Sequence, residues 1–166
     1  MIKVSIPQLS RYIKPIVVFF VAIAVVMSLT TATSAATASV PLEITVYRDP
    51  FCSCCEGWID YLTNQGFQPT SVKTSTIETL KQQYGVPNDL VSCHTAVING
   101  YVVEGHVPAD DIKRLLAEQP NDVAGISVPG MPIGTPGMES GDVREPFTVF
   151  SFDKQGNTEV FKKYSF

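Results

Sequence analysis

Three cysteines occupy four consecutive positions at residues 52–55, Cys-Ser-Cys-Cys, and the fourth cysteine of the chain, Cys93, is followed directly by His94. Thiolates bind soft or borderline metals such as Cu(I) and Zn(II). Two cysteines three positions apart can also form a redox-active pair. Four cysteines allow three different pairings into two disulfides. The pattern therefore admits a metal site, a redox pair or two structural disulfides.

The third cysteine of the cluster, Cys54, helps to rank these possibilities. It lies inside the CxxC spacing formed by Cys52 and Cys55, and a simple dithiol reaction does not need it. A disulfide between the neighbours Cys54 and Cys55 would require a strained ring. A strand-to-helix turn here would place the thiols at a helix N-terminus, where unpaired amides and the dipole stabilise thiolate. These features favour clustered metal-binding thiolates over two structural disulfides.

Regular elements must position these thiols, and hydrophobic spacing and turn signals predict where they lie. The cysteines are expected in the first turn of a helix of about ten residues, whose apolar face includes Trp58 and which ends at Gly66. Asn99-Gly100 suits the two-residue turn of a hairpin. The predicted strands are 42–48 and 67–73, the hairpin is 96–103, and the other helices are 76–84 and 108–118.

The order strand, helix, strand, helix, hairpin, helix, with cysteines at the first strand-to-helix turn, predicts an α/β protein with a thioredoxin-like fold. In such a fold the loop before the third strand packs against the redox turn. In this chain that loop carries Ser92, Cys93 and His94. Cys93 is therefore expected to approach the three-cysteine turn, so that four thiolates from two loops converge.

The C-terminal part differs in composition. Residues 121–146 contain four Pro and five Gly, which excludes a long helix or strand, and they carry Met131 and Met138. Residues 147–164 alternate in a way that predicts a closing hairpin. We therefore expect one thioredoxin-like core at 42–120, extended by a Gly/Pro/Met-rich loop and a β-hairpin at 121–166 of the same domain.

The first 38 residues resemble a leader. They hold three basic and no acidic residues, then an apolar run from Ile16 to Leu29 and small residues that permit cleavage after Ala36 or Ala38. The run of about 14 residues is short for a membrane span, although a retained N-terminal membrane anchor is the alternative. Either outcome predicts an exported, periplasmic or otherwise extracytoplasmic protein, which would touch a membrane only through an uncleaved leader.

Charge excludes one class of partner. Without the leader, nine Lys and Arg face 16 Asp and Glu, a net charge of about −7. An acidic domain without a basic patch is a poor candidate for binding nucleic acid or an anionic membrane surface. Export also means that disulfides can persist, so the redox and disulfide alternatives stay open.

The other residues that could take part in chemistry have simpler roles as well. His94 is either a ligand, a residue that supports the ligands, or a hydrogen-bonded histidine at a strand start. His106 is interpreted as a local cap or surface residue. Met131 and Met138 are soft potential copper ligands, but a packing role under the loop is favoured. Trp58 is expected in the core.

Four blocks together resemble the CopG-type family of exported copper-resistance proteins, long described only as a metal-binding domain of unknown function. They are the CSCC turn with Trp58, SCHTA around Cys93-His94, YVVEGHVP at 101–108 and VPGMPIGTPGME at 128–139. They span roughly residues 44–150 in the family order. The resemblance implies a thioredoxin-like fold and a copper site of cysteines, with Cys52, Cys54, Cys55 and Cys93 as metal ligands and His94 beside them.

The resemblance further implies a role in periplasmic copper handling alongside other copper-handling proteins. The expected ligand is Cu(I), as several ions bridged by thiolates, and a single tetrahedral Zn(II) is the alternative. The function predicted is capture of Cu(I) for copper resistance or homeostasis, with a redox step allowed by thiol and copper chemistry. The rival is a thiol-disulfide oxidoreductase in which Cys52 attacks and Cys55 resolves. A structural domain with two disulfides is the third hypothesis.

Overall fold

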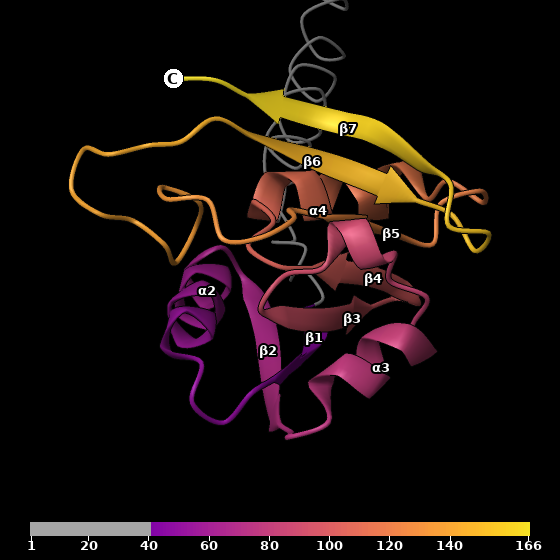
Figure 1. The fold of residues 1–166 in the computed structure, drawn as a ribbon, viewed down its shortest axis with the longest axis horizontal. Helices are drawn as coiled ribbons and strands as arrows, with labels where there is room; N and C mark the ends of the chain where they lie inside the picture. Colours follow the sequence, from indigo (N-terminus) through magenta and orange to yellow (C-terminus); the bar gives the residue numbers. More distant parts are fainter. Residues whose placement is uncertain (1–40) are drawn as a thin grey trace, which may run out of the picture. The chain divides into compact units, whose positions relative to one another are not determined.

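The computed structural model describes residues 41–166, and the leader predicted for residues 1–38 lies outside these. Within the described residues, no helix has the length and apolar character needed to cross a membrane. The described part contains three α-helices and one seven-stranded sheet in the order β2-β1-β3-β4-β5-β6-β7 (Figure 1). The strands are β1 Leu42–Arg48, β2 Phe67–Lys73, β3 His94–Ile98, β4 Tyr101–Glu104, β5 Gly125–Ser127, β6 Phe147–Phe152 and β7 Thr158–Tyr164. The helices are α2 Ser53–Asn64, α3 Ile77–Gln83 and α4 Ala109–Glu118.

The mixed α/β class predicted from the sequence is confirmed, and most elements lie within a few residues of their predicted bounds. β1 and β2 are parallel, so a crossover must join them, and α2 supplies it. The β3–β4 turn places Asn99 and Gly100 at φ of 48° and 85°. Positive φ at both central residues is the signature of a type I′ turn, which matches the right-handed twist of the two strands.

The short strand β5 was not predicted. It lies in the Gly- and Pro-rich segment and joins β4, in parallel, to the C-terminal hairpin. Gly125 at its start packs so closely on Val102 that a Cβ would lie within 2.8 Å of the Val102 side chain. β5 therefore makes the C-terminal hairpin continuous with the sheet of the predicted core.

Helices cover both faces of the sheet (Figure 1). α2 and α4 share one hydrophobic cluster with β1, β3 and β4, in which Trp58 is fully buried, as predicted. A smaller cluster on the other side of the sheet includes Val102 of β4 and Phe152 of β6. Because neighbouring strand residues point to opposite faces, His94 of β3 faces α2 while Thr95 faces α3.

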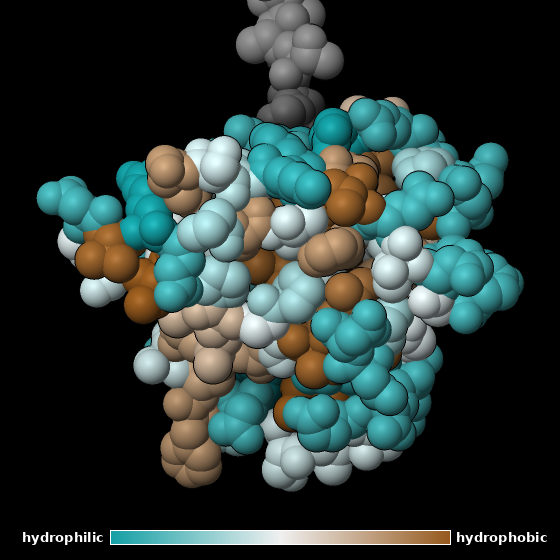
Figure 2. All heavy atoms as spheres, turned by 45° about the horizontal axis from the view of Figure 1, so that its top comes forward, coloured by the Kyte–Doolittle hydropathy of each residue, from teal (hydrophilic) through white to brown (hydrophobic). Residues whose placement is uncertain are grey.

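In the view of Figure 2 hydrophilic side chains cover much of the surface, and apolar side chains form a continuous area at the lower left. Phe51, directly before the first cysteine, is 94% exposed. Single exposed apolar side chains of this kind are normal on folded proteins.

Candidate metal centre

The first loop of the site is the turn that begins α2. Cys52 is the N-cap residue, and Cys54 and Cys55 lie in the first turn of the helix, as the sequence predicts. Cys55 is fully buried and forms a disulfide with Cys52. Cys54 and Cys93 are free thiols. The hypothesis of two structural disulfides is therefore wrong for this structure, which pairs only the two cysteines of the CxxC spacing.

A buried arginine holds this turn in place. The guanidinium of Arg48, at the end of β1, donates to the carbonyl oxygens of Asp49 and Cys52 at 3.3 and 3.4 Å. It also donates to the Glu56 carboxylate at 2.6 Å and to the hydroxyl of Ser71 at 3.0 Å. Burying a guanidinium is unfavourable unless its donors are used. The fork of Arg48 therefore ties β1, β2 and α2 together under the cysteines.

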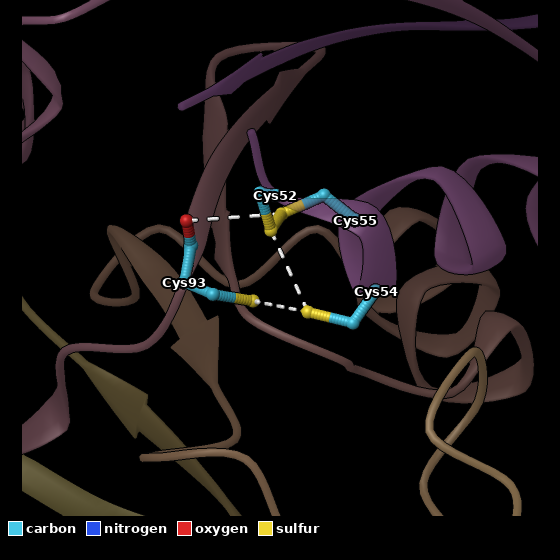
Figure 3. A group of neighbouring side chains, drawn as sticks. All are labelled: Cys52, Cys54, Cys55 and Cys93. Carbon is cyan, nitrogen blue, oxygen red and sulfur yellow. Dashed lines mark hydrogen bonds between the residues drawn. A yellow bond between two sulfur atoms is a disulfide. The ribbon is translucent and has the colours of Figure 1, made fainter. Parts of the chain in front are cut away.

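The second loop of the site carries Cys93, just before β3. Its sulfur lies 3.9 Å from that of Cys54, which in turn lies 3.5 Å from the sulfur of Cys52. In Figure 3 the Cys93 side chain points toward Cys54 and the disulfide. All four cysteine sulfurs lie within 4.8 Å of one another, close enough to hold a metal ion. The structure thus brings together the four predicted ligands, and their binding of metal stays a prediction.

The Cys93 thiol is protonated in this environment. Burial raises its pKa to about 12, and the neighbouring Cys54 acts in the same direction. Metal ions bind the thiolate, so metal binding at Cys93 must displace a proton. A soft cation bound here would supply the positive charge that a buried thiolate needs.

His94 begins β3 and is fully buried beside the site. Its Nδ1 lies 3.2 Å from the Cys93 sulfur, and its ring lies 4.4 Å from the Trp58 ring. Its Nε2 is buried without a hydrogen-bond partner among the described residues. Burial lowers the pKa of His94 well below its usual value, with a smaller contribution from His106. His94 is therefore a neutral ring in contact with the sulfur.

The interpretation of His106 as a cap or surface residue is wrong. His106 is fully buried, and its Nε2 lies 3.1 Å from the sulfur of Cys93. Its Nδ1 lies 2.7 Å from the carbonyl oxygen of Pro136, so Nδ1 carries the proton and donates to that oxygen. Burial lowers its pKa. The neutral ring therefore turns an unprotonated Nε2 toward Cys93, which is the arrangement common for histidine ligands of metals.

No spacing rule could have found His106 in the sequence. It lies 13 positions from Cys93, in the loop between β4 and α4. The available signal was only its residue type beside Gly105. Gly105 has φ of 73°, and a Cβ there would lie 2.6 Å from the carbonyl oxygen of Val128 and would overlap the Ser92 side chain. This close approach is what brings His106 and the Cys93 loop together.

The Gly- and Pro-rich segment completes the site. Gly137 packs on Gly57 of α2 so tightly that a Cβ on Gly137 would lie 2.7 Å from the Gly57 carbonyl carbon. This contact holds the preceding Pro136 over His106. Gly130, at the other end, donates to the carbonyl oxygen of Val91 at 3.0 Å. The segment thus fixes one of the two histidines and borders the Cys93 loop.

The two methionines proposed as additional ligands lie in this segment. Met131 is 53% exposed, and Met138 is half-buried. The Met138 backbone closes a turn, since its amide donates to Thr135 and its carbonyl oxygen accepts from Gly134. A metal-ligand role for Met131 and Met138 stays a prediction.

Two groups of potential ligands meet at Cys93. One is the set of four cysteines, and the other consists of Cys93, His94 and His106. Four sulfurs suit Cu(I) or Zn(II), whereas one thiolate with two imidazoles is a donor set used by copper centres that change oxidation state. The site is therefore chemically suited to soft metals, with Cys93 shared by both groups.

The protein is thus an α/β protein with a cysteine- and histidine-lined candidate metal centre between two loops, and comparisons with known proteins agree. A family model described as a protein of unknown function, DUF411, matches residues 90–138. Two similar solved structures are forms 2 and 1 of a copper resistance protein, CopG. Form 2 is 43% identical with a TM-score of 0.72, over 76% of this chain and 100% of that one. Form 1 is also 43% identical with a TM-score of 0.71, over 75% and 98%.

The search of curated proteins gives no relative of this chain. The similarity to the two solved structures nevertheless extends over about three quarters of this chain, at an identity well above the level at which only the fold is shared. The chain belongs to the CopG-type copper-resistance protein family, as its four sequence blocks predicted.

Proposed function

We propose that the protein captures Cu(I) as cysteine thiolate complexes outside the cytoplasm and so protects the cell against copper. The observation that carries this proposal is the approach of four cysteine sulfurs to within 4.8 Å of one another. Membership of a copper-resistance family makes copper the first metal to test. Thiolate sulfur favours Cu(I) over harder ions, and a thiolate can bridge two copper ions.

The proposed ligands are Cys52, Cys54, Cys55 and Cys93, with nitrogen from His106 and from His94 as a supporting donor. All four sulfurs become available only when the Cys52–Cys55 disulfide is reduced, which takes two electrons and two protons. The oxidised form offers the Cys54 and Cys93 thiols and the two imidazoles. We therefore expect the reduced protein to bind more than one Cu(I), with Zn(II) as the weaker alternative.

A redox step fits the same residues. Two thiols can give one electron to each of two Cu(II) ions, releasing two protons and forming a disulfide together with two Cu(I). Cys52 and Cys55 are already paired in this structure, and the set of one thiolate and two imidazoles tolerates both oxidation states of copper. The proposal does not require this step, because capture of Cu(I) by thiolates alone lowers the free ion.

We further propose that residues 42–120 form a thioredoxin-like core and that 121–166 extend it. The support is the order of β1, α2, β2, α3, the β3–β4 hairpin and α4, with helices on both faces of the sheet. The extension adds β5 to β7 to the sheet and supplies the Pro136 contact to His106. The proposed location is the periplasm or another extracytoplasmic space, with other copper-handling proteins as partners.

The Cys52–Cys55 disulfide also supports a second function, thiol-disulfide exchange, because a CxxC pair at a helix start is the common arrangement for that reaction. One variant separates the two functions. Cys54→Ser should spare a Cys52/Cys55 dithiol reaction, whereas it should lower the number of copper ions held by a four-thiolate site. Disulfide reductase activity that is retained in Cys54→Ser, together with unchanged copper binding, would reverse our preference.

A further inference from the structure

A buried ion pair lies on the face of the β3–β4 hairpin opposite the metal centre. Lys81 of α3 is 2% exposed, and Glu104 at the end of β4 is fully buried. The ammonium nitrogen of Lys81 lies 2.5 Å from Oε1 of Glu104. Thr95 of β3, directly across from Glu104 in the register, joins them. Thr95 and Glu104 thus face α3, whereas His94, the neighbour of Thr95, faces the candidate metal centre.

A pair of this kind seldom improves stability, because removing two charges from water costs about as much as their attraction returns. Apolar residues of similar size would hold α3 on the sheet at least as stably. The pair is nevertheless part of a hydrogen-bonded network, since the Thr95 hydroxyl donates to Oε2 of Glu104 at 2.7 Å and accepts from Lys81 at 3.1 Å. A polar network satisfied to this degree fixes geometry more strictly than apolar packing does.

One further bond leads from this network to the metal centre. The backbone amide of Ser92 donates to Oε1 of Glu104 at 2.7 Å. On the other side of Cys93, the carbonyl oxygen of His94 accepts from the Gly105 amide at 3.0 Å. Two consecutive residues at the end of β4 therefore hold the two neighbours of Cys93, and the sulfur has little freedom to leave the cluster.

We propose that Glu104, neutralised by Lys81, is a positioning residue that sets the place of the Cys93 sulfur through the Ser92 amide. The effect on metal rests on the proposed copper-binding function, while the effect on Cys93 does not. Cys93 belongs to both groups of potential ligands, so its displacement should weaken both. Glu104 acts across the sheet and touches neither the sulfur nor a metal.

A matched pair of double variants tests this. Lys81→Met/Glu104→Gln removes both charges but keeps an oxygen that can accept from Ser92. Lys81→Met/Glu104→Leu removes the charges and that acceptor. Both are made in a Cys54→Ser background with the Cys52–Cys55 disulfide intact, so that Cys93 is the free thiol. The readout is its rate of reaction with an aromatic disulfide reagent, on metal-free protein whose folding is checked by circular dichroism.

We expect the leucine variant to react roughly tenfold faster than the parent, the factor that loss of one hydrogen bond to a charged group would give. The glutamine variant should stay near the parental rate. Equal rates in all three proteins, or equal acceleration in both variants, would overturn the positioning role. With Cys54 restored, the reduced leucine variant should also bind less Cu(I) per folded chain than the glutamine variant, and equal binding would overturn the effect on metal.

A measurement on the unmodified protein guards against a leucine variant that does not fold. The Ser92 amide should exchange with solvent as slowly as the paired amides of β3, and fast exchange would overturn the proposal. If the parent protein binds no Cu(I) while the leucine variant still frees Cys93, the positioning claim stands and the copper function falls. The thiol rate and the copper content therefore separate the two failures.

Discussion

The sulfur of Cys93 and Nε2 of His106 lie 3.1 Å apart, although Cys93 precedes the β3–β4 hairpin in the chain and His106 follows it. The antiparallel register places the end of β4 beside the start of β3. Gly105 then allows the backbone to pass close to Ser92. Because Pro136 holds the proton on the other ring nitrogen, His106 turns a free lone pair toward the sulfur. A sulfur and a nitrogen donor are thus set side by side from one hairpin.

His106 should therefore matter for copper. His106→Ala is expected to weaken Cu(I) affinity by roughly 10- to 100-fold, the range seen when groups that order a metal site are removed. His94→Ala should have a smaller effect than His106→Ala or any cysteine change, because no hydrogen-bond partner within residues 41–166 holds the other ring nitrogen of His94. Competition with a Cu(I) chelator measures both. An equal or larger loss in His94→Ala would contradict this ranking.

Cys93→Ser should reduce the copper bound per chain, despite a separation of 38 positions from Cys55. A serine hydroxyl is a poor ligand for Cu(I), and both groups of potential ligands lose their shared member. Elemental analysis of the reduced, copper-loaded variant against the parent gives the answer. Unchanged stoichiometry would show that the two loops do not form one site.

Gly137→Ala should lower both copper affinity and thermal stability. Its φ of 80° is unfavourable for alanine, and the added Cβ would overlap α2, so the segment must move and carry Pro136 away from His106. Gly141→Ala is the matched control, since its φ is 57° and the space around it is open. The control should lose stability by about 1 kcal/mol and keep its copper affinity. Equal copper affinity in both variants would show that the Gly- and Pro-rich segment does not support the metal centre.

Arg48→Met should destabilise the protein by about 2 kcal/mol, because two backbone carbonyls of the cysteine turn lose a charged donor. Glu56→Gln is the control. The Glu56 side chain is 59% exposed, so loss of this ion pair should cost less than about 1 kcal/mol. Urea titration of the metal-free protein compares the two. A larger effect for Glu56→Gln would mean that the ion pair, rather than the carbonyl contacts, holds the turn.

Most of the fold could be predicted from local signals in the sequence. The cysteine turn at the start of α2, the Asn99-Gly100 hairpin and the burial of Trp58 follow from periodicity and turn chemistry, and the structure contains all three. β5 was missed because three residues between prolines and glycines give no periodic signal. It forms only because β4 and β6 offer it partners on both sides, which is information held by the tertiary structure.

The candidate site was partly predictable for the same reason. The three clustered cysteines could be recognised from residue type and spacing alone. The fourth ligand, Cys93, was predicted because its loop was expected to pack on the start of the helix. His106 and Glu104 gave no such signal. Their roles depend on a strand register and on contacts with Pro136 and Ser92 that no spacing in the sequence encodes.

The proposed copper function is tested most directly by the ratio of metal to protein. The protein should be purified anaerobically, with its thiols reduced, after expression with copper and zinc both available. We predict more than one copper per chain in the parent, with the excess over one lost in Cys54→Ser. One zinc per chain would keep the four-sulfur site but contradict the copper role. No metal in a fully reduced protein would contradict the site itself.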